Sequence, residues 1–212
     1  MNAPRWSEAV LRWLLPDRDR GPISGDLLEE YREAVVPTLG ERRARWWYRR
    51  QVAGFVWRAV RLPLLVGLAL GAALGATMLI DTARQPLAED DGQTMIVAAG
   101  MVLLLWSAAA LAATWRTRRM SDAVKAGVIL GVVTLLVFQL AAIVRINVFL
   151  DAIQYRDDWH NLLLRYSQSG FHSLRAYANY EYVVTVTPVL IGAIGGSISG
   201  TLGGLVHIFR EG

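Results

Sequence analysis

Four long stretches of this chain contain no Asp, Glu, Lys or Arg, and they constrain its fold more than any other feature. Each runs for 19 residues or more, over residues 62–80, 92–115, 126–144 and 182–209. At a rise of about 1.5 Å per residue, about 20 apolar residues cross the hydrocarbon core of a bilayer. Helices buried in a soluble bundle usually keep a polar face, whereas these stretches are apolar on all sides. We therefore predict an all-α integral membrane protein with four transmembrane helices, over 62–80, 95–115, 126–144 and 183–209.

The basic residues predict the orientation of these helices. Placing the N-terminus inside puts 17 of the 22 Lys and Arg residues on the inner side of the membrane. Short basic loops stay in the cytoplasm. The chain has 21 Arg and a single lysine, Lys125; lysine codons are A-rich, so this ratio indicates a GC-rich, bacterial genome. The charged first 60 residues hold no signal-peptide core. We expect a multi-pass protein of the bacterial cytoplasmic (inner) membrane with N- and C-termini in the cytoplasm.

Residues 1–61 are predicted to form a cytoplasmic helical prefix ahead of a membrane domain at 62–212. The prefix contains 12 arginines and eight acidic residues. Proline interrupts helices and glycine commonly follows their ends, so Pro16, Pro37 and Gly40 divide the prefix into three helices. The second helix is predicted to begin near Ser24, a favourable N-cap residue.

The first helix of the prefix carries an apolar face. Trp6, Val10 and Trp13 fall on this face at helical spacing, and we expect Tyr31 and Trp47 to meet it. A segment this short has little core of its own. Its aromatic faces are therefore expected to pack on each other, on the membrane surface or on a partner.

The two predicted outer segments differ in character. The loop at 81–91 is short and acidic, while the segment at 145–181 is longer and interleaves aromatic with polar residues. Within the longer segment, residues 149–166 have the pattern of an amphipathic helix at the membrane interface. We predict an extracytoplasmic interfacial helix there.

Glycines recur at helical spacing within the spans. The predicted helix-packing residues are Gly192, Gly196, Gly200 and Gly204 in the fourth span, and Gly67, Gly71 and Gly75 in the first. The third span also contains two glycines, Gly127 and Gly131. Helices in lipid associate through close backbone approach and dispersion contacts, which glycine permits. One interpretation is tight packing within the bundle, of the first span against the fourth. The other is a glycine zipper that lines a homo-oligomeric pore. We favour packing, because glycine is common in membrane helices.

No catalytic, cofactor-binding or metal-binding residues are predicted. Cysteine is absent, and His160, His172 and His207 do not cluster with carboxylates at metal-ligand spacing. Asp157 and Asp158 precede His160, but adjacent residues on a helix do not face one another. No phosphate-binding glycine loop is present. We also expect no nucleic-acid partner, because the orientation rule accounts for the arginines.

Three short blocks in the prefix resemble a known family. They are Trp13-Leu14-Leu15-Pro16, then Gly25-Asp26-Leu27 with Glu29-Glu30-Tyr31, then Trp47-Tyr48 with Gln51. Over residues 4–60 their order and spacing are similar to the permease prefix domain, the N-terminal module of MacB/FtsX-like acidobacterial duplicated orphan ABC permeases. The resemblance implies a transport-associated, non-enzymatic module and supplies no catalytic residues.

These observations lead to one function and two alternatives. The leading prediction is a non-enzymatic accessory or interaction subunit associated with an ABC-type permease. The first alternative is a small glycine-zipper channel or transporter. The second is a membrane-anchored regulator whose prefix binds a cytoplasmic protein. The expected partners are the lipid bilayer and either another membrane protein or further copies of the chain.

Overall fold

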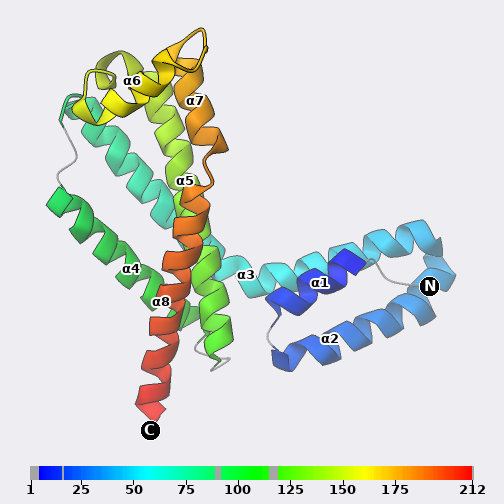
Figure 1. Cartoon of the computed structure of the whole chain (residues 1–212). Coiled ribbons are helices and arrows are strands. Elements are labelled where there is room, and N and C mark those ends of the chain that lie inside the picture. The colour runs from blue at the N-terminus through cyan, green and yellow to red at the C-terminus, as the bar shows by residue number, and fades with distance from the viewer. Residues whose placement is uncertain (1–4, 16, 89–91, 115–118, 212) are drawn as a thin grey trace. The chain divides into compact units, whose positions relative to one another are not determined.

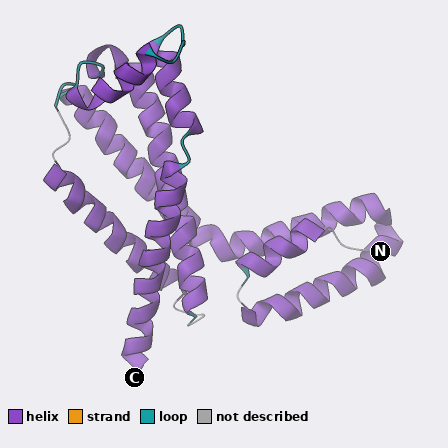
Figure 2. Ribbon diagram, viewed as in Figure 1, coloured by secondary structure: helices purple, strands orange, loops and turns teal. Residues whose placement is uncertain are grey.

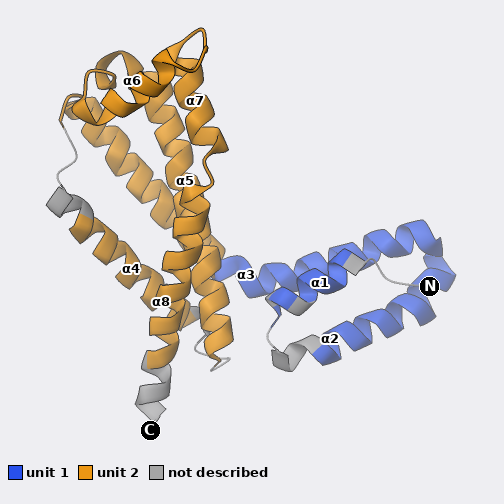
Figure 3. Ribbon diagram, viewed as in Figure 1, with its two compact units in different colours: residues 1–62 blue, residues 63–212 orange. Residues whose placement is uncertain are grey.

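The computed structural model describes residues 5–15, 17–88, 92–114 and 119–211. Within these ranges every regular element is a helix (Figure 2). The chain divides into two compact units, Met1–Leu62 and Pro63–Gly212 (Figure 3). We call them the N-terminal unit and the C-terminal unit. The boundary between them falls one residue after the predicted end of the prefix at residue 61.

The N-terminal unit consists of helices that surround a core of its own. It contains α1 (Arg5–Leu14), α2 (Asp17–Glu30), the π-helical turn η1 (Tyr31–Val35) and the first part of α3 (Val36–Arg84) (Figure 1). Each of these elements contributes side chains to one buried cluster, formed by Leu11, Leu15, Leu27, Tyr31, Val35, Ala44, Tyr48 and Val52. Tyr31 and Tyr48 meet edge to face, with ring centroids 5.4 Å apart. This geometry is favourable for aromatic pairs.

The turn between the second and third prefix helices lies at Gly40 and not at Pro37. Pro37 stands in the helical segment that follows η1, whereas Gly40 has φ 72°. A positive φ costs little for a residue without a Cβ. The second helix also begins earlier than expected, at Asp17 instead of near Ser24. Pro16, which was predicted to end the first helix, lies outside the described residues.

The predicted apolar face of the first helix is wrong. Trp6 and Trp13 are 54% and 57% exposed, while Leu11 is fully buried. The face that enters the core carries Ser7, Leu11 and Leu15, which are spaced by one helical turn. Two apolar faces compete on this short helix, and packing selects the one that bears leucine.

The C-terminal unit contains the long apolar helices. These are the second part of α3, α4 (Gly92–Thr114), α5 (Met120–Ile153) and α8 (Thr187–Glu211). Among the described residues three helical segments, within α3, α5 and α7–α8, are long and apolar enough to cross a membrane. The described apolar part of α4, Ile96–Ala112, is shorter. Glu89, Asp90, Asp91, Arg116 and Arg118 of the predicted loops lie outside the described residues.

Two predicted spans differ from the helices observed. The stretch at 126–144 lies within α5, whose 34 residues extend about 51 Å at the helical rise. The stretch at 183–209 begins too early, because α7 (Leu174–Val184) ends there and α8 starts at Thr187. Pro188 explains the break, since proline lacks an N–H and is tolerated in the first turn of a helix.

A small helical cap joins α5 to α8. It comprises the end of α5, the 3₁₀ turn η2 (Asp157–Trp159), α6 (His160–Ser167) and α7. Its core contains Ile146, Leu150, Ile153, Trp159 and Ala178. The prediction of one amphipathic helix over 149–166 is therefore wrong. The extended backbone of Arg156, with ψ 146°, separates α5 from η2, and the apolar residues of this region face each other.

Candidate functional site

The glycine stripe of α8 lies directly against α5. A Cβ added at Gly196 would collide with the carbonyl oxygen of Gly127, and one added at Gly131 would collide with that of Gly192. At Gly200 the added atom would lie 2.5 Å from the carbonyl oxygen of Ala123. Small residues on both helices thus allow backbone to meet backbone, the arrangement that stabilises helix pairs in lipid.

The ends and flanks of this stripe have different neighbours. A Cβ at Gly204 would lie 3.3 Å from Cγ of the flexible Met120 side chain, so this position has room to adapt. The neighbouring glycines face α4. At Gly203 an added Cβ would lie 2.7 Å from the carbonyl oxygen of Ser107, and at Gly195 it would lie 3.0 Å from the ring of Trp106. Helix α8 therefore packs on α5 and α4 through adjacent small-residue faces.

The glycines of α3 also meet α5. Added Cβ atoms at Gly71 and Gly75 would each lie 2.5 Å from α5, against the Thr134 carbonyl oxygen and Ala141 Cβ respectively. Gly67 would approach the Leu130 carbonyl oxygen at 3.0 Å. The expected pairing of the first span with the fourth is wrong. Both stripes contact α5, which is the common partner of α3 and α8.

Polar groups buried between these helices bond to one another or to the backbone. Trp106 Nε1 donates to Thr134 Oγ1 at 3.2 Å, and this hydroxyl donates to the Leu130 carbonyl at 2.8 Å. Ser199 Oγ donates to the Leu103 carbonyl at 3.3 Å. Gln139, which the sequence places inside the third span, donates to the carbonyl of Tyr182 near the end of α7. These hydrogen bonds hold neighbouring helices together. None of them involves an ionisable side chain.

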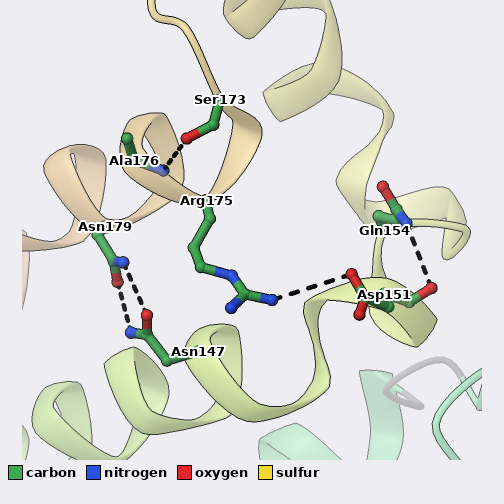
Figure 4. Close-up of polar contacts among 7 residues, drawn as sticks. All are labelled: Asn147, Asp151, Gln154, Ser173, Arg175, Ala176 and Asn179. Atoms are coloured by element: carbon green, nitrogen blue, oxygen red, sulfur yellow. Dashed lines mark hydrogen bonds and ion pairs between the residues drawn. The ribbon is translucent and has the colours of Figure 1, made fainter.

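The cap joins α5 to α7 through polar side chains (Figure 4). Asn147 and Asn179 exchange two amide hydrogen bonds, of 2.9 and 3.1 Å. One turn further along α5, Asp151 lies 3.9 Å from Arg175. Ser173 caps α7 by accepting from the backbone N–H of Ala176 at 3.2 Å. The reciprocal amide pair defines the register of α7 on α5.

A hollow of about 360 Å³ opens in the cap between η2, α6 and the end of α7. It is lined by Asp158, Trp159, Asn161, Leu162, Arg165, Glu181, Tyr182 and Thr185. The charged groups here are paired: Tyr177 Oη donates to Glu181 at 2.5 Å, and Arg165 lies 3.9 Å from the same carboxylate. Arg156 Nε donates to Asp158 at 3.0 Å. Paired charges at a partly exposed surface stabilise a fold only slightly.

No group of three His, Asp or Glu residues in the described part of the chain is arranged to hold a metal ion. His160 and His172 are exposed on the cap. The side chain of His207 lies outside the described residues.

Sequence reasoning missed two features of this region. The Trp106–Thr134 bond joins residues 28 positions apart, so helical periodicity contains no signal for it. The second feature is the cap core, for which a signal existed. The apolar residues Ile146, Leu150 and Ile153 continue the α5 pattern beyond the charge of Arg145, and they indicate a helix longer than the hydrocarbon core requires.

No protein-family model, no curated protein and no solved structure matches this chain. The similarity of residues 4–60 to the permease prefix domain therefore rests on the sequence blocks alone.

Proposed function

We propose that this chain is a non-enzymatic, four-span protein of the bacterial cytoplasmic membrane that acts as an accessory or interaction subunit. In this proposal α4 supplies the fourth crossing, and both termini are cytoplasmic. The observation that carries the proposal is the division of α3 between two separately packed units. One unit holds apolar helices, and the other displays a charged surface on the same continuous chain.

The packing of the apolar helices supports a structural role for them. Both glycine stripes are occupied by contacts with α5 inside one chain, so they are not free to line a pore between copies. The polar groups between the helices are bonded in pairs. Ionisable residues within a membrane usually mark pathways for ions or protons, and the charge-free stretches of these helices contain no Asp, Glu, Lys or Arg. A channel or transporter built on the glycine stripes is the weaker candidate.

The prefix blocks divide into core and surface residues. Leu15, Leu27, Tyr31 and Tyr48 are buried, so these positions specify the fold of the N-terminal unit. Another set is exposed at helical spacing along α2 and η1, formed by Asp26, Glu29, Glu30 and Glu33. We assign this acidic stripe to the binding of a partner protein, and the resemblance to a permease prefix suggests an ABC-type permease.

The test is cross-linking from the acidic stripe in native membranes. A photoreactive residue replacing Glu29 should cross-link the chain to a membrane-transport subunit that mass spectrometry identifies. The same residue at Glu41, which is exposed but pairs with Arg45 at 3.1 Å, is the matched control and should give no such product. Cross-links to copies of the chain alone, together with conductance in liposomes, would replace this proposal with the channel alternative.

A further inference from the structure

One face of α3 in the N-terminal unit is exposed and lies opposite the core. The core side carries Ala44, Tyr48 and Val52. At about 100° per residue, the opposite side of the helix after Gly40 carries one stripe of exposed residues: Arg42, Arg43, Trp46, Arg50, Ala53 and Trp57. We call these six residues the Arg–Trp stripe. Trp46 and Trp57 are 63% and 51% exposed, which is unusual for large aromatic side chains on a folded unit.

The stripe is strongly positive. Residues 39–58 contain six arginines and one acidic residue, Glu41. Glu41 is bonded to Arg45, an arginine outside the stripe. The arginines of the stripe thus face solvent together with the two tryptophans, and their charge is not neutralised by the acidic residues of this segment.

The arginines and aromatic rings are arranged together. Arg50 lies over the Trp46 ring at 5.6 Å, and Arg49 lies over the Trp6 ring at 5.5 Å from the centroid. An open hollow of about 750 Å³ runs beside them, lined by Leu39, Arg42, Arg43, Arg45, Trp46, Trp47 and Arg49. Guanidinium groups bind phosphate oxygens in a bidentate manner, while tryptophan rings prefer the headgroup level of a bilayer.

We propose that the Arg–Trp stripe docks on the anionic phospholipid surface of the membrane that the chain itself enters. The arginines bind the phosphodiester headgroups, and Trp46 and Trp57 insert at the level of the headgroups. The sequence supports this occupant, because Trp57 precedes the first charge-free stretch, which begins at residue 62, by only five residues. At the helical rise this separation is about 8 Å, so the end of the stripe cannot lie far from a bilayer.

A lipid surface fits the stripe better than a protein does. Basic helices with tryptophan bind anionic membranes through combined charge and apolar burial. The acidic stripe belongs to α2 and η1, whereas the Arg–Trp stripe belongs to α3, so the lipid proposal and the proposed function rest on different residues. The experiment below distinguishes a lipid surface from two other occupants of the stripe, an acidic protein and a second copy of the chain.

The test uses the full chain in vesicles. The natural sequence has no cysteine, so Ala53→Cys places a single fluorescent label on the stripe. Ala34→Cys, exposed on η1, is the matched control. Vesicles contain either phosphatidylcholine alone or phosphatidylcholine with phosphatidylglycerol, both with a headgroup nitroxide lipid as quencher.

We expect the label at position 53 to be quenched strongly in phosphatidylglycerol vesicles and weakly in phosphatidylcholine. Raising NaCl should release it, because the Debye length falls from about 10 Å at 0.1 M to about 3 Å at 1 M. The label at position 34 should respond to neither change. Equal quenching at position 53 in both lipids, or quenching by a second labelled copy that rises with protein density, would overturn the proposal.

Charge variants locate the effect on the stripe. Each arginine near an anionic surface strengthens binding about fivefold. The triple variant Arg42→Gln, Arg43→Gln, Arg50→Gln should therefore weaken docking about a hundredfold. The corresponding triple Lys variant keeps the charge but loses the bidentate geometry, and should weaken docking less. Unchanged hydrogen exchange around Tyr48 verifies that the unit stays folded. Wild-type quenching in the Gln variant would show that the arginines do not bind lipid. The outcome of this lipid-docking test does not depend on the outcome of cross-linking at Glu29.

Discussion

The two units of this protein are built in opposite ways. The core of the N-terminal unit consists of large side chains, with Leu11, Tyr31 and Tyr48 fully or almost fully buried beneath a charged surface. In the C-terminal unit the closest helix contacts are made by glycine backbones. There many large apolar residues face outward, as Ile96 and Leu104 do at 74% and 72% exposure, although others such as Leu130 are buried.

The difference follows from the solvent that each unit meets. Burial of apolar area stabilises a fold in water by about 25 cal/mol per Å², so the N-terminal unit gains most by enclosing leucine and tyrosine. Hydrocarbon offers no such gain, and helices there are stabilised by close contact and by internal hydrogen bonds. Glycines are consequently found at the closest helix contacts of the C-terminal unit, and many of its large apolar residues are exposed.

The largest expected effect concerns the aromatic pair of the N-terminal unit. Tyr48→Ala should lower the free energy of unfolding by about 3 to 5 kcal/mol, as for a fully buried aromatic side chain. Trp13→Ala, at an exposed position, should cost less than about 1 kcal/mol. Hydrogen exchange of residues 44–52 in the full chain measures both. Similar losses of stability in the two variants would mean that Tyr48 does not belong to the core of the N-terminal unit.

A pH titration should also weaken the N-terminal unit. Burial, with smaller contributions from Glu8 and Tyr31, raises the pKa of Tyr48 from 10.0 to about 12. The folded state then holds the phenol proton more tightly than the unfolded state does. Stability is therefore fully present below pH 10 and falls as pH rises toward 12, by about 2 to 3 kcal/mol.

The matched variant for this titration is Tyr48→Phe. The Tyr48 hydroxyl has no hydrogen-bond partner among the described residues, so its removal should leave stability at neutral pH unchanged or higher. The loss between pH 10 and 12, followed by circular dichroism of the tyrosines, should disappear. An unchanged pH profile in Tyr48→Phe would assign the transition to another group.

Within the glycine stripe of α8, position should decide the cost of one methyl group. Gly196→Ala places a Cβ against the Gly127 backbone, which cannot move aside, and should cost about 1 to 3 kcal/mol. Gly204→Ala places its Cβ 3.3 Å from the flexible Met120 side chain and 3.4 Å from the Ala123 Cβ, and should be tolerated. Unfolding in mixed detergent micelles compares the stability of the two variants. Equal stability would show that Gly196 does not lie against the Gly127 backbone.

The smallest expected effect concerns the polar bond between α4 and α5. Trp106→Phe removes the donor to Thr134 Oγ1 and should cost about 1 kcal/mol, typical of interhelical hydrogen bonds in membranes. Thr134→Ser keeps the acceptor and is the control. Unfolding of the two variants in detergent measures the loss of stability. A cost of several kcal/mol would mean that side-chain bonding, and not glycine contact, dominates this unit.

The sequence predicts the apolar helices well because hydrocarbon excludes charge, a condition that can be read residue by residue. It predicts their ends poorly. Arg145 ends the charge-free stretch, yet α5 continues to Ile153 because the cap buries Ile146 and Leu150. Pro188 indicates the break before α8 in the sequence. The long apolar stretch that contains this proline nevertheless suggested one continuous helix.

The partner of a glycine stripe is harder to predict than its presence. A helix face that bears leucines requires a complementary surface on its partner helix, but glycine has no side chain that could specify its neighbour. The small residues Ala123, Gly127 and Gly131 on α5, spaced by four, are the only sequence signal for the observed pairing. On α1 the opposite difficulty arises, because tryptophan and leucine faces compete and the choice depends on the shape of the core.

The most direct test of this account is a double-mutant cycle between Gly127→Ala and Gly196→Ala, measured by unfolding of the full chain in mixed micelles. Their backbones share one contact within a single chain, so the two costs should be non-additive by about 0.5 to 3 kcal/mol. The oligomeric state in mild detergent should be the same for all four members of the cycle. Additive costs, or variants that stay folded but change their oligomeric state, would show that the α8 stripe contacts another copy instead of α5.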